Sequence, residues 1–308
     1  MPPGASPSAA SLSAASVSGA SHASRDVPYP FADTDADFER IEFFSVVTSQ
    51  ILGGRFLPSV DHLENRKVEI LDCCCGSGAW TTDIACVMPL AHVVGFDIRA
   101  TRVEHHVPNA EFLVADVNEP LPFDDDTFDI VHSRTVCLAV TNWDDYLREL
   151  KRVLKPTGYI HLIEPVIQPI SQQDLPLMYD LLIASRFGGT GLNIYAGTGV
   201  VDAARVAGLH VCQAQSFPFQ LGTLGADSDA DRIGSMMLSC MQDSMRALVD
   251  ELGERAAISP EARRPYYEEV DRYLSEPNRE WGIVEYVVAC KDSSLQADPS
   301  VAVARNGA

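Results

Sequence analysis

The chain has no run of basic residues, no apolar stretch long enough to cross a membrane and no Cys-x-x-Cys pair. Its 43 acidic residues outnumber its 23 basic ones, and the formal net charge is −20. Because such a surface repels a phosphate backbone, we expect neither nucleic acid nor a membrane surface as a partner. A transmembrane helix needs about 20 apolar residues, so the sequence predicts a soluble protein. Small molecules and other proteins remain as partners.

The ends of the chain and its cysteines indicate how it is organised. The first residues lack the apolar core of a secretory signal. Segment 1–27, rich in Ala and Ser, has too little large apolar surface to offset the entropy of ordering, so we expect a disordered tail there and a flexible tail over 293–308. The eight cysteines lie mostly in apolar stretches, which predicts reduced, buried thiols and a cytoplasmic location, with the nucleus as the alternative. Residues 28–292 are long enough for one domain with a sizeable core.

From residue 68 onward, short apolar runs alternate with helical patterns, which is typical of an α/β sheet. The first five runs are mostly apolar rather than alternating, as expected for strands that helices cover on both faces. The predicted strands are 68–73, 92–97, 111–115, 128–132, 159–164, 211–217 and 283–290.

The clearest predicted helix begins at Trp143, where apolar residues recur at helical spacing up to Leu154. Asn142 is its predicted cap, and residues 155–158 end it. Segment 28–66 is expected to contribute a helical cover through a helix at 40–52, and segment 229–276 a helical insertion between the sixth and seventh strands. The apolar helices predicted at 175–187 and 233–249 either wall an acceptor pocket or simply cover the sheet.

A glycine-containing loop, Asp72-Cys73-Cys74-Cys75-Gly76-Ser77-Gly78, follows the first strand. Gly76 and Gly78 have no Cβ, so the backbone can adopt positive φ and approach a ligand closely. The spacing differs from the Gly-x-Gly-x-x-Gly of dinucleotide sites, and no Lys follows as in a phosphate-binding loop. Dinucleotides and nucleoside triphosphates therefore fit this loop poorly.

Two carboxylates follow the next strands. Asp97 ends the second strand, where its side chain can accept hydrogen bonds from two ribose hydroxyls. Asp116 follows the third strand and can accept from an adenine amino group. The structural alternative for both is a turn, since Asp is a common turn residue.

This order of motifs, completed by Phe128-Asp129-Ile130-Val131, resembles the class I S-adenosylmethionine-dependent methyltransferases. It resembles more specifically the fungal LaeA- and UMTA-like methyltransferases of secondary metabolism, over about residues 28–165. The further motifs that carry this resemblance are Tyr29-Pro30, Glu39-Arg40-Ile41, Gly76-Ser77-Gly78-Ala79-Trp80, His132-Ser133-Arg134, Trp143 and Leu154-Lys155-Pro156-Thr157-Gly158-Tyr159.

The resemblance implies a Rossmann-like fold, with seven mostly parallel strands, an antiparallel last strand, helices on both faces and a helical cover over the acceptor pocket. It implies S-adenosylmethionine as cofactor, held by Asp72, Cys74, Gly76, Gly78, Asp97, Ile98, Asp116, Val117 and Ser133. Asp72 either touches the cofactor or orients the loop. The family usually has Gly at position 74, so positive φ at Cys74 would cost about 1 kcal/mol.

His132 and Glu164 are the candidate catalytic bases, because each lies at the carboxyl end of a strand. The alternative for His132 is a structural hydrogen bond. No metal site is expected, since the adjacent Cys73, Cys74 and Cys75 point to alternating faces and zinc ligands are usually spaced further apart.

We therefore expect methyl transfer to a small molecule, most simply to oxygen, in secondary-metabolite biosynthesis. One alternative is a regulatory protein with a methyltransferase fold that acts through protein partners. Another is a nicotinamide-dependent dehydrogenase, which the glycine spacing and the predicted last-strand hairpin disfavour.

Overall fold

The computed structural model describes residues 35–52, 66–103, 106–166, 171–185, 192–193, 196–222, 228–276 and 280–294. Three predicted features lie wholly or partly outside the described residues. They are the tail over 1–27, the Tyr29-Pro30 pair, and residues 295–308 of the tail predicted over 293–308. Among the helices that the structure describes, none has the length and apolar character needed to cross a bilayer.

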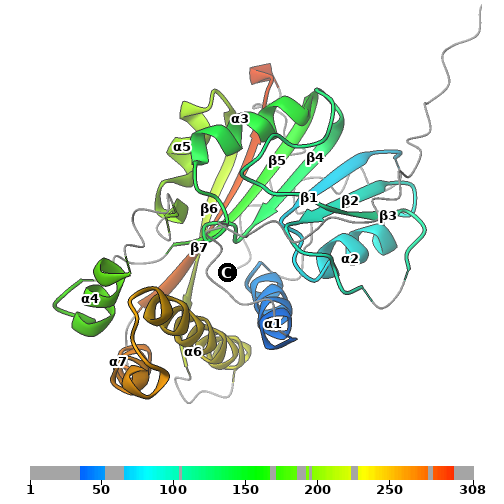
Figure 1. Ribbon diagram of the computed structural model, residues 1–308. Helices are drawn as coiled ribbons and strands as arrows, with labels where there is room; N and C mark the ends of the chain where they lie inside the picture. Colours follow the sequence, from blue (N-terminus) through cyan, green and yellow to red (C-terminus); the bar gives the residue numbers. More distant parts are fainter. Residues whose placement is uncertain are drawn as a thin grey trace, which may run out of the picture.

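A seven-stranded sheet forms the centre of the molecule, with the strand order β3-β2-β1-β4-β5-β7-β6 (Figure 1). The first five strands are parallel, and β7 is antiparallel to both of its neighbours. This arrangement confirms the predicted fold. The strands are β1 (Glu69–Cys73), β2 (His92–Asp97), β3 (Ala110–Val114), β4 (Phe128–Arg134), β5 (Leu154–Val166), β6 (His210–Gln220) and β7 (Glu280–Cys290).

Helices cover both faces of the sheet. α2 (Ala79–Val87) packs on one face, where it contributes Trp80 and Ile84 to an apolar core cluster with the sheet. α3 (Trp143–Val153) and α5 (Val200–Val206) pack on the other face and share a second cluster. The Asn142 side chain caps α3 by accepting hydrogen bonds from the backbone N–H groups of Asp144 and Asp145. The cap is where the sequence predicts it.

The remaining described helices form a cover at one end of the sheet. α1 (Asp35–Ile51) packs against α6 (Asp229–Arg255), and α6 packs against α4 (Pro176–Ala184) and α7 (Arg264–Leu274). In Figure 1, α4, α6 and α7 are grouped together, and α1 lies between α6 and α2. The apolar cluster shared by α4, α6 and α7 is separate from the two clusters on the sheet, and α1 packs on α6 in a further small cluster. α6, the short 3₁₀ helix η4 (Pro260–Arg263) and α7 follow β6 and precede β7.

Several boundaries, and the covering of one strand, differ from the sequence prediction. α1 begins at Asp35, before the predicted residue 40. β5 begins at Leu154 rather than 159, because Leu154 pairs with Phe128 before a register irregularity. β3 lies at the edge of the sheet, and Val114 is 66% exposed, so this strand is only half covered despite its apolar sequence.

Candidate functional site

The backbone of the loop after β1 lies in the left-handed region at three positions. Cys74, Gly76 and Gly78 have φ angles of 54°, 57° and 81°. A Cβ on Gly76 would lie 2.9 Å from Cγ2 of Ile41, because α1 packs directly on the loop. A side chain at 76 would therefore force the Ile41 side chain or the loop to shift. Cys74 adopts a left-handed backbone conformation, which is sterically unfavourable for any residue that has a Cβ.

Asp97, at the end of β2, is tied to this loop. Its Oδ2 accepts from the backbone N–H of Gly76 (3.0 Å), and its Oδ1 accepts from the N–H of Arg99 (3.1 Å). The side chain is buried, and burial raises the pKa of the carboxyl. Each carboxylate oxygen has a second lone pair for a ligand hydroxyl.

Asp116 follows β3 in a half-buried loop. Its Oδ1 accepts from both the backbone N–H (2.9 Å) and the side-chain Nδ2 (3.1 Å) of Asn118. Asp116 is thereby held beside Val117, and both residues line the same cavity as Asp97.

Asp72 lies in the buried sheet below the loop. Thr81 in α2 donates its hydroxyl to Oδ2 of Asp72 at 2.6 Å, which fixes the carboxyl against the helix that follows the loop. Burial raises the pKa of Asp72 to about 7, although the Thr81 hydrogen bond and the charge of Arg134 oppose the shift.

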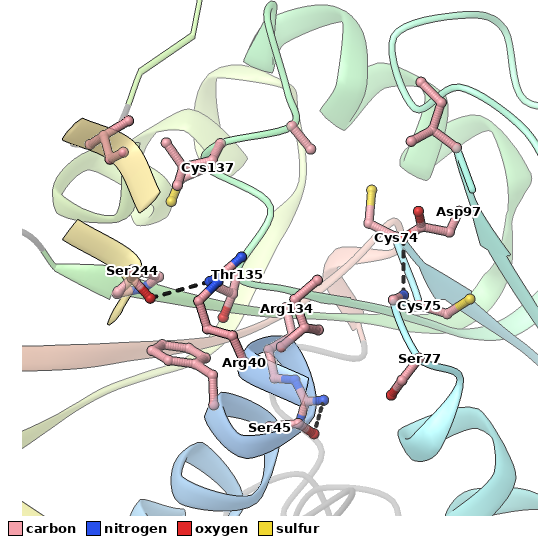
Figure 2. A pocket seen from close by; sticks show the side chains of 18 of the residues that line it. Arg40, Ser45, Cys74, Cys75, Ser77, Asp97, Arg134, Thr135, Cys137 and Ser244 are labelled. Atoms are coloured by element: carbon pink, nitrogen blue, oxygen red, sulfur yellow. Dashed lines mark hydrogen bonds between the residues drawn. The ribbon is translucent and has the colours of Figure 1, made fainter. Parts of the chain in front are cut away.

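These groups border a cavity of about 220 Å³. Figure 2 shows Asp97 and the cysteines of the loop on one side of it, and Arg40, Ser244 and Cys137 on the other. Seven of the nine predicted cofactor residues line it: Asp72, Cys74, Gly76, Asp97, Ile98, Asp116 and Val117.

Gly78 and Ser133 do not line the cavity. A Cβ on Gly78 would meet Val103 and Phe112 at 2.7 Å, so this glycine faces packed side chains at the start of α2. Ser133 is fully buried, and its hydroxyl accepts a hydrogen bond from Tyr146 at 2.7 Å.

The two predicted bases lie outside the cavity lining as well. His132 is buried, stacks on Trp80 and has no hydrogen-bond partner at either ring nitrogen. Burial lowers its pKa well below the ordinary value, and the charge of Arg134 acts in the same direction. The carboxylate of Glu164 accepts from the backbone N–H groups of Val136 (2.9 Å) and Cys137 (3.2 Å), and it holds the loop after β4. Burial raises the pKa of Glu164 to about 8.

Sequence reasoning missed the polar groups that α1 brings to the cavity. Arg40 donates to Oγ of Ser244 in α6 (3.2 Å), and Arg134 donates to Oγ of Ser45 in α1 (2.6 Å) (Figure 2). Arg40 and Arg134 belong to motifs that carry the resemblance, which was the only signal for them. Nothing near Ser244 in the sequence points to a site.

A buried ion pair holds α1 in this position. Asp37 in α1 accepts from the guanidinium of Arg99 at 2.7 Å, and both side chains are less than a tenth exposed. Arg99 follows Asp97 in the chain and also stacks over Phe38. The acid after β2 and the helix over the glycine loop are therefore parts of one network.

The far side of the cavity is apolar. α6 and α7 supply most of it, and Leu175, the residue before α4, completes it. The apolar side chains from α6 and α7 are Met241, Met245, Leu248, Val270, Tyr273 and Leu274. The sequence left open whether the helices predicted at 175–187 and 233–249 wall a pocket or cover the sheet. Segment 233–249 supplies Met241, Met245 and Leu248 to this wall, whereas the described part of segment 175–187 supplies only Leu175. Within the described part of the chain, no group of three metal-ligating side chains comes together.

Comparison with known proteins gives the family of the central segment. Residues 64–186 match the family described as "Methyltransferase domain". "Secondary metabolism regulator LAE1" of Cochliobolus heterostrophus is 34% identical over 145 residues, which are 46% of each chain. "Methyltransferase pytC" of Aspergillus terreus is 25% identical over 219 residues, 68% of this chain and 66% of that protein. Over the first of these matches, the chain spans about half the length of the relative.

A solved structure shares the fold. It is the phosphoethanolamine N-methyltransferase 2 of Haemonchus contortus, with a TM-score of 0.50 and 15% identity. The match covers 82% of this chain and 58% of that one. Together with the sheet order and the glycine loop, these comparisons confirm the resemblance drawn from the motifs: residues 64–186 match a methyltransferase domain, and the chain is similar over about half of its length to a LaeA-like regulator of fungal secondary metabolism.

Proposed function

We propose that this protein transfers the methyl group of S-adenosylmethionine to an oxygen of a small, apolar acceptor in secondary metabolism. One observation carries the proposal: the glycine loop and its acids line the same cavity as the apolar side chains of α6 and α7. A donor site and an acceptor site thus share one enclosed space.

The residues present fit the cofactor. Gly76 has no side chain and adopts a positive φ, so the loop backbone is open to the cavity at this position, and Asp97 has lone pairs left for the two ribose hydroxyls. Ile98 and Val117 offer apolar surface for an adenine ring, beside the Asp116 carboxylate. Asp72 holds the loop through Thr81. The chemistry that the bound cofactor supplies is an activated methyl group on a sulfonium.

The chain's own contribution is then alignment and exclusion of water. α1 closes over the glycine loop through Ile41 and is anchored by Asp37 and Arg99. Met245 and Leu248 of α6 and Tyr273 of α7 give the acceptor an apolar wall. Arg134 and Arg40 lie on the side toward α1, and although Arg40 also pairs with Asp37, the two guanidinium groups favour an acceptor that carries negative charge.

The placement of His132 and Glu164 favours an acceptor that needs no base. Neither side chain lines the cavity, and the Glu164 carboxylate is engaged by two backbone N–H groups. An acceptor that is already ionised at neutral pH, such as a carboxylate, attacks the methyl group without losing a proton first. We therefore propose no base role for either residue and an acidic oxygen as the acceptor atom.

The relatives favour a second candidate, a regulatory protein that acts through partners, because one of them is named a secondary metabolism regulator. Both candidates place the protein in a reducing compartment, the cytoplasm or the nucleus, which is consistent with eight free cysteines. They differ in whether a small acceptor is methylated.

The test incubates the purified full chain with methyl-labelled S-adenosylmethionine and a panel of apolar carboxylic acids and phenols, and mass spectrometry detects the gain of one methyl group. Met245→Trp fills the acceptor side and should remove labelling while leaving cofactor affinity unchanged. Ser239→Trp, on the exposed side of the same helix, is the matched control. Cofactor binding without labelling of any acceptor would favour the regulatory candidate.

A further inference from the structure

Two cysteines far apart in the sequence meet at the edge of the sheet, away from the cavity. The sulfur of Cys212 in β6 lies 3.0 Å from the sulfur of Cys290, the last residue of β7. Both sulfurs lie 3.5 Å from the carbonyl oxygen of His210, to which both thiols can donate. A disulfide bond is about 2.05 Å long, so the two sulfurs need to approach by only about 1 Å.

The backbone explains why these side chains converge. His210 pairs with Cys290 across the two strands, and the register shifts between Val211 and Gln213. Cys212 is therefore the extra residue of a β-bulge, and a bulge re-aims the side chain at that position.

We propose that Cys212 and Cys290 are a disulfide-forming pair, a modification site that closes when the protein meets a peroxide. Cys212 is half-buried on the edge strand β6, so the oxidant reaches its sulfur first. Cys290 is fully buried, and burial raises the pKa of its thiol, so it acts as the resolving partner.

The reaction balances with hydrogen peroxide as the oxidant. The Cys212 sulfur attacks one peroxide oxygen, the O–O bond breaks, and a sulfenic acid and one water form. The Cys290 sulfur then attacks the Cys212 sulfur, the S–O bond breaks, and the second water leaves with the proton of the Cys290 thiol. Two electrons pass from the two thiols to the peroxide.

The bond would close a long loop of the chain that contains the helical insertion. The cysteines are 78 positions apart, and the segment between them contains α6, η4 and α7. Closing so long a loop restricts the unfolded chain and stabilises the folded one. Because Cys212 and Cys290 lie at the opposite end of the β6–β7 pair from the insertion, the bond should leave the cavity unchanged.

The experiment treats the full chain with a small excess of hydrogen peroxide and compares it with the reduced protein. We expect the loss of two of the eight thiols, a single crosslinked peptide joining residues 212 and 290, and a melting temperature higher by about 5–10 °C. Dithiothreitol should reverse the shift, and affinity for S-adenosylhomocysteine should be unchanged.

Cys212→Ser and Cys290→Ser should each abolish the shift, whereas Cys86→Ser, on the exposed surface of α2, should retain it. The peptide map of the wild-type protein does not depend on whether these variants fold. Crosslinks between other cysteines, dimers linked between chains, or an intact set of eight thiols would overturn the proposal.

Discussion

The imidazole of His132 lies flat against the indole of Trp80, with ring centroids 3.7 Å apart and planes within 5° of each other. Trp80 lines the cavity and His132 does not. Both nitrogens of His132 lack hydrogen-bond partners, and its pKa is held well below the ordinary value by burial. His132 is therefore neutral at pH 7 and supports a wall of the cavity through ring stacking.

His132→Phe tests this role, because Phe keeps a ring against Trp80 and removes both nitrogens. We expect methyl transfer within a few-fold of wild type and a stability change below about 1.5 kcal/mol. His132→Ala removes the ring and should cost about 2–5 kcal/mol, measured by denaturant unfolding. If His132→Phe abolished turnover and also removed a limb of the pH–rate profile while the fold was retained, His132 would be a base after all.

Asp72→Asn should change the pH dependence of stability. The ordinary pKa of an Asp side chain is 3.8, and burial in the folded protein raises the pKa of Asp72 to about 7. Between about pH 4 and 7 the folded state keeps a proton that the unfolded state loses, so wild-type stability falls as pH rises. Asn cannot titrate and can still accept from the Thr81 hydroxyl.

The measurement is the difference in melting temperature between the variant and the wild type, taken from pH 4 to pH 8. This difference should change in favour of the variant by several degrees as the pH rises over the range. The exposed Asp124→Asn serves as the control and should give a flat difference. A flat difference for Asp72→Asn would show that its carboxyl does not titrate as burial requires.

Position 74 should tolerate Gly and reject a β-branched residue. Cys74 has a φ of 54°, which Gly adopts freely and Val does not. We expect Cys74→Gly to bind S-adenosylhomocysteine within a few-fold of wild type, and Cys74→Val to bind about 10-fold more weakly or worse. Equal affinities of the two variants would mean that the loop backbone is not strained when the ligand binds.

The sequence predicted the parts of the fold that depend on local pattern. Apolar runs located all seven strands, helical spacing located the helix at Trp143, and Asn142 caps it as expected. Periodicity could not locate the sheet edge, since β3 is as apolar in sequence as a buried strand and its exposure depends on what lies beside it.

Long-range contacts limited the prediction of the site. The acids at strand ends, such as Asp97, are brought to one edge by parallel topology alone, and that topology follows from the alternation of strands and helices. The contact of Arg40 with Ser244 joins residues 204 positions apart, and no local pattern encodes it. His132 occupies a strand end as expected, yet the stacking of Trp80 upon it decides what it does.

The central claim is that the loop and Asp97 form a binding site for S-adenosylmethionine. Isothermal titration calorimetry of S-adenosylhomocysteine into the full chain tests it most directly, with Asp97→Asn as the variant, Asp124→Asn as the control and thermal unfolding as the check that each is folded. We predict one site per chain, unchanged affinity in Asp124→Asn and a loss of about 100-fold in Asp97→Asn, because two charge-assisted hydrogen bonds are weakened. No heat with the wild-type chain, or equal affinity for wild type and a folded Asp97→Asn, would contradict the account.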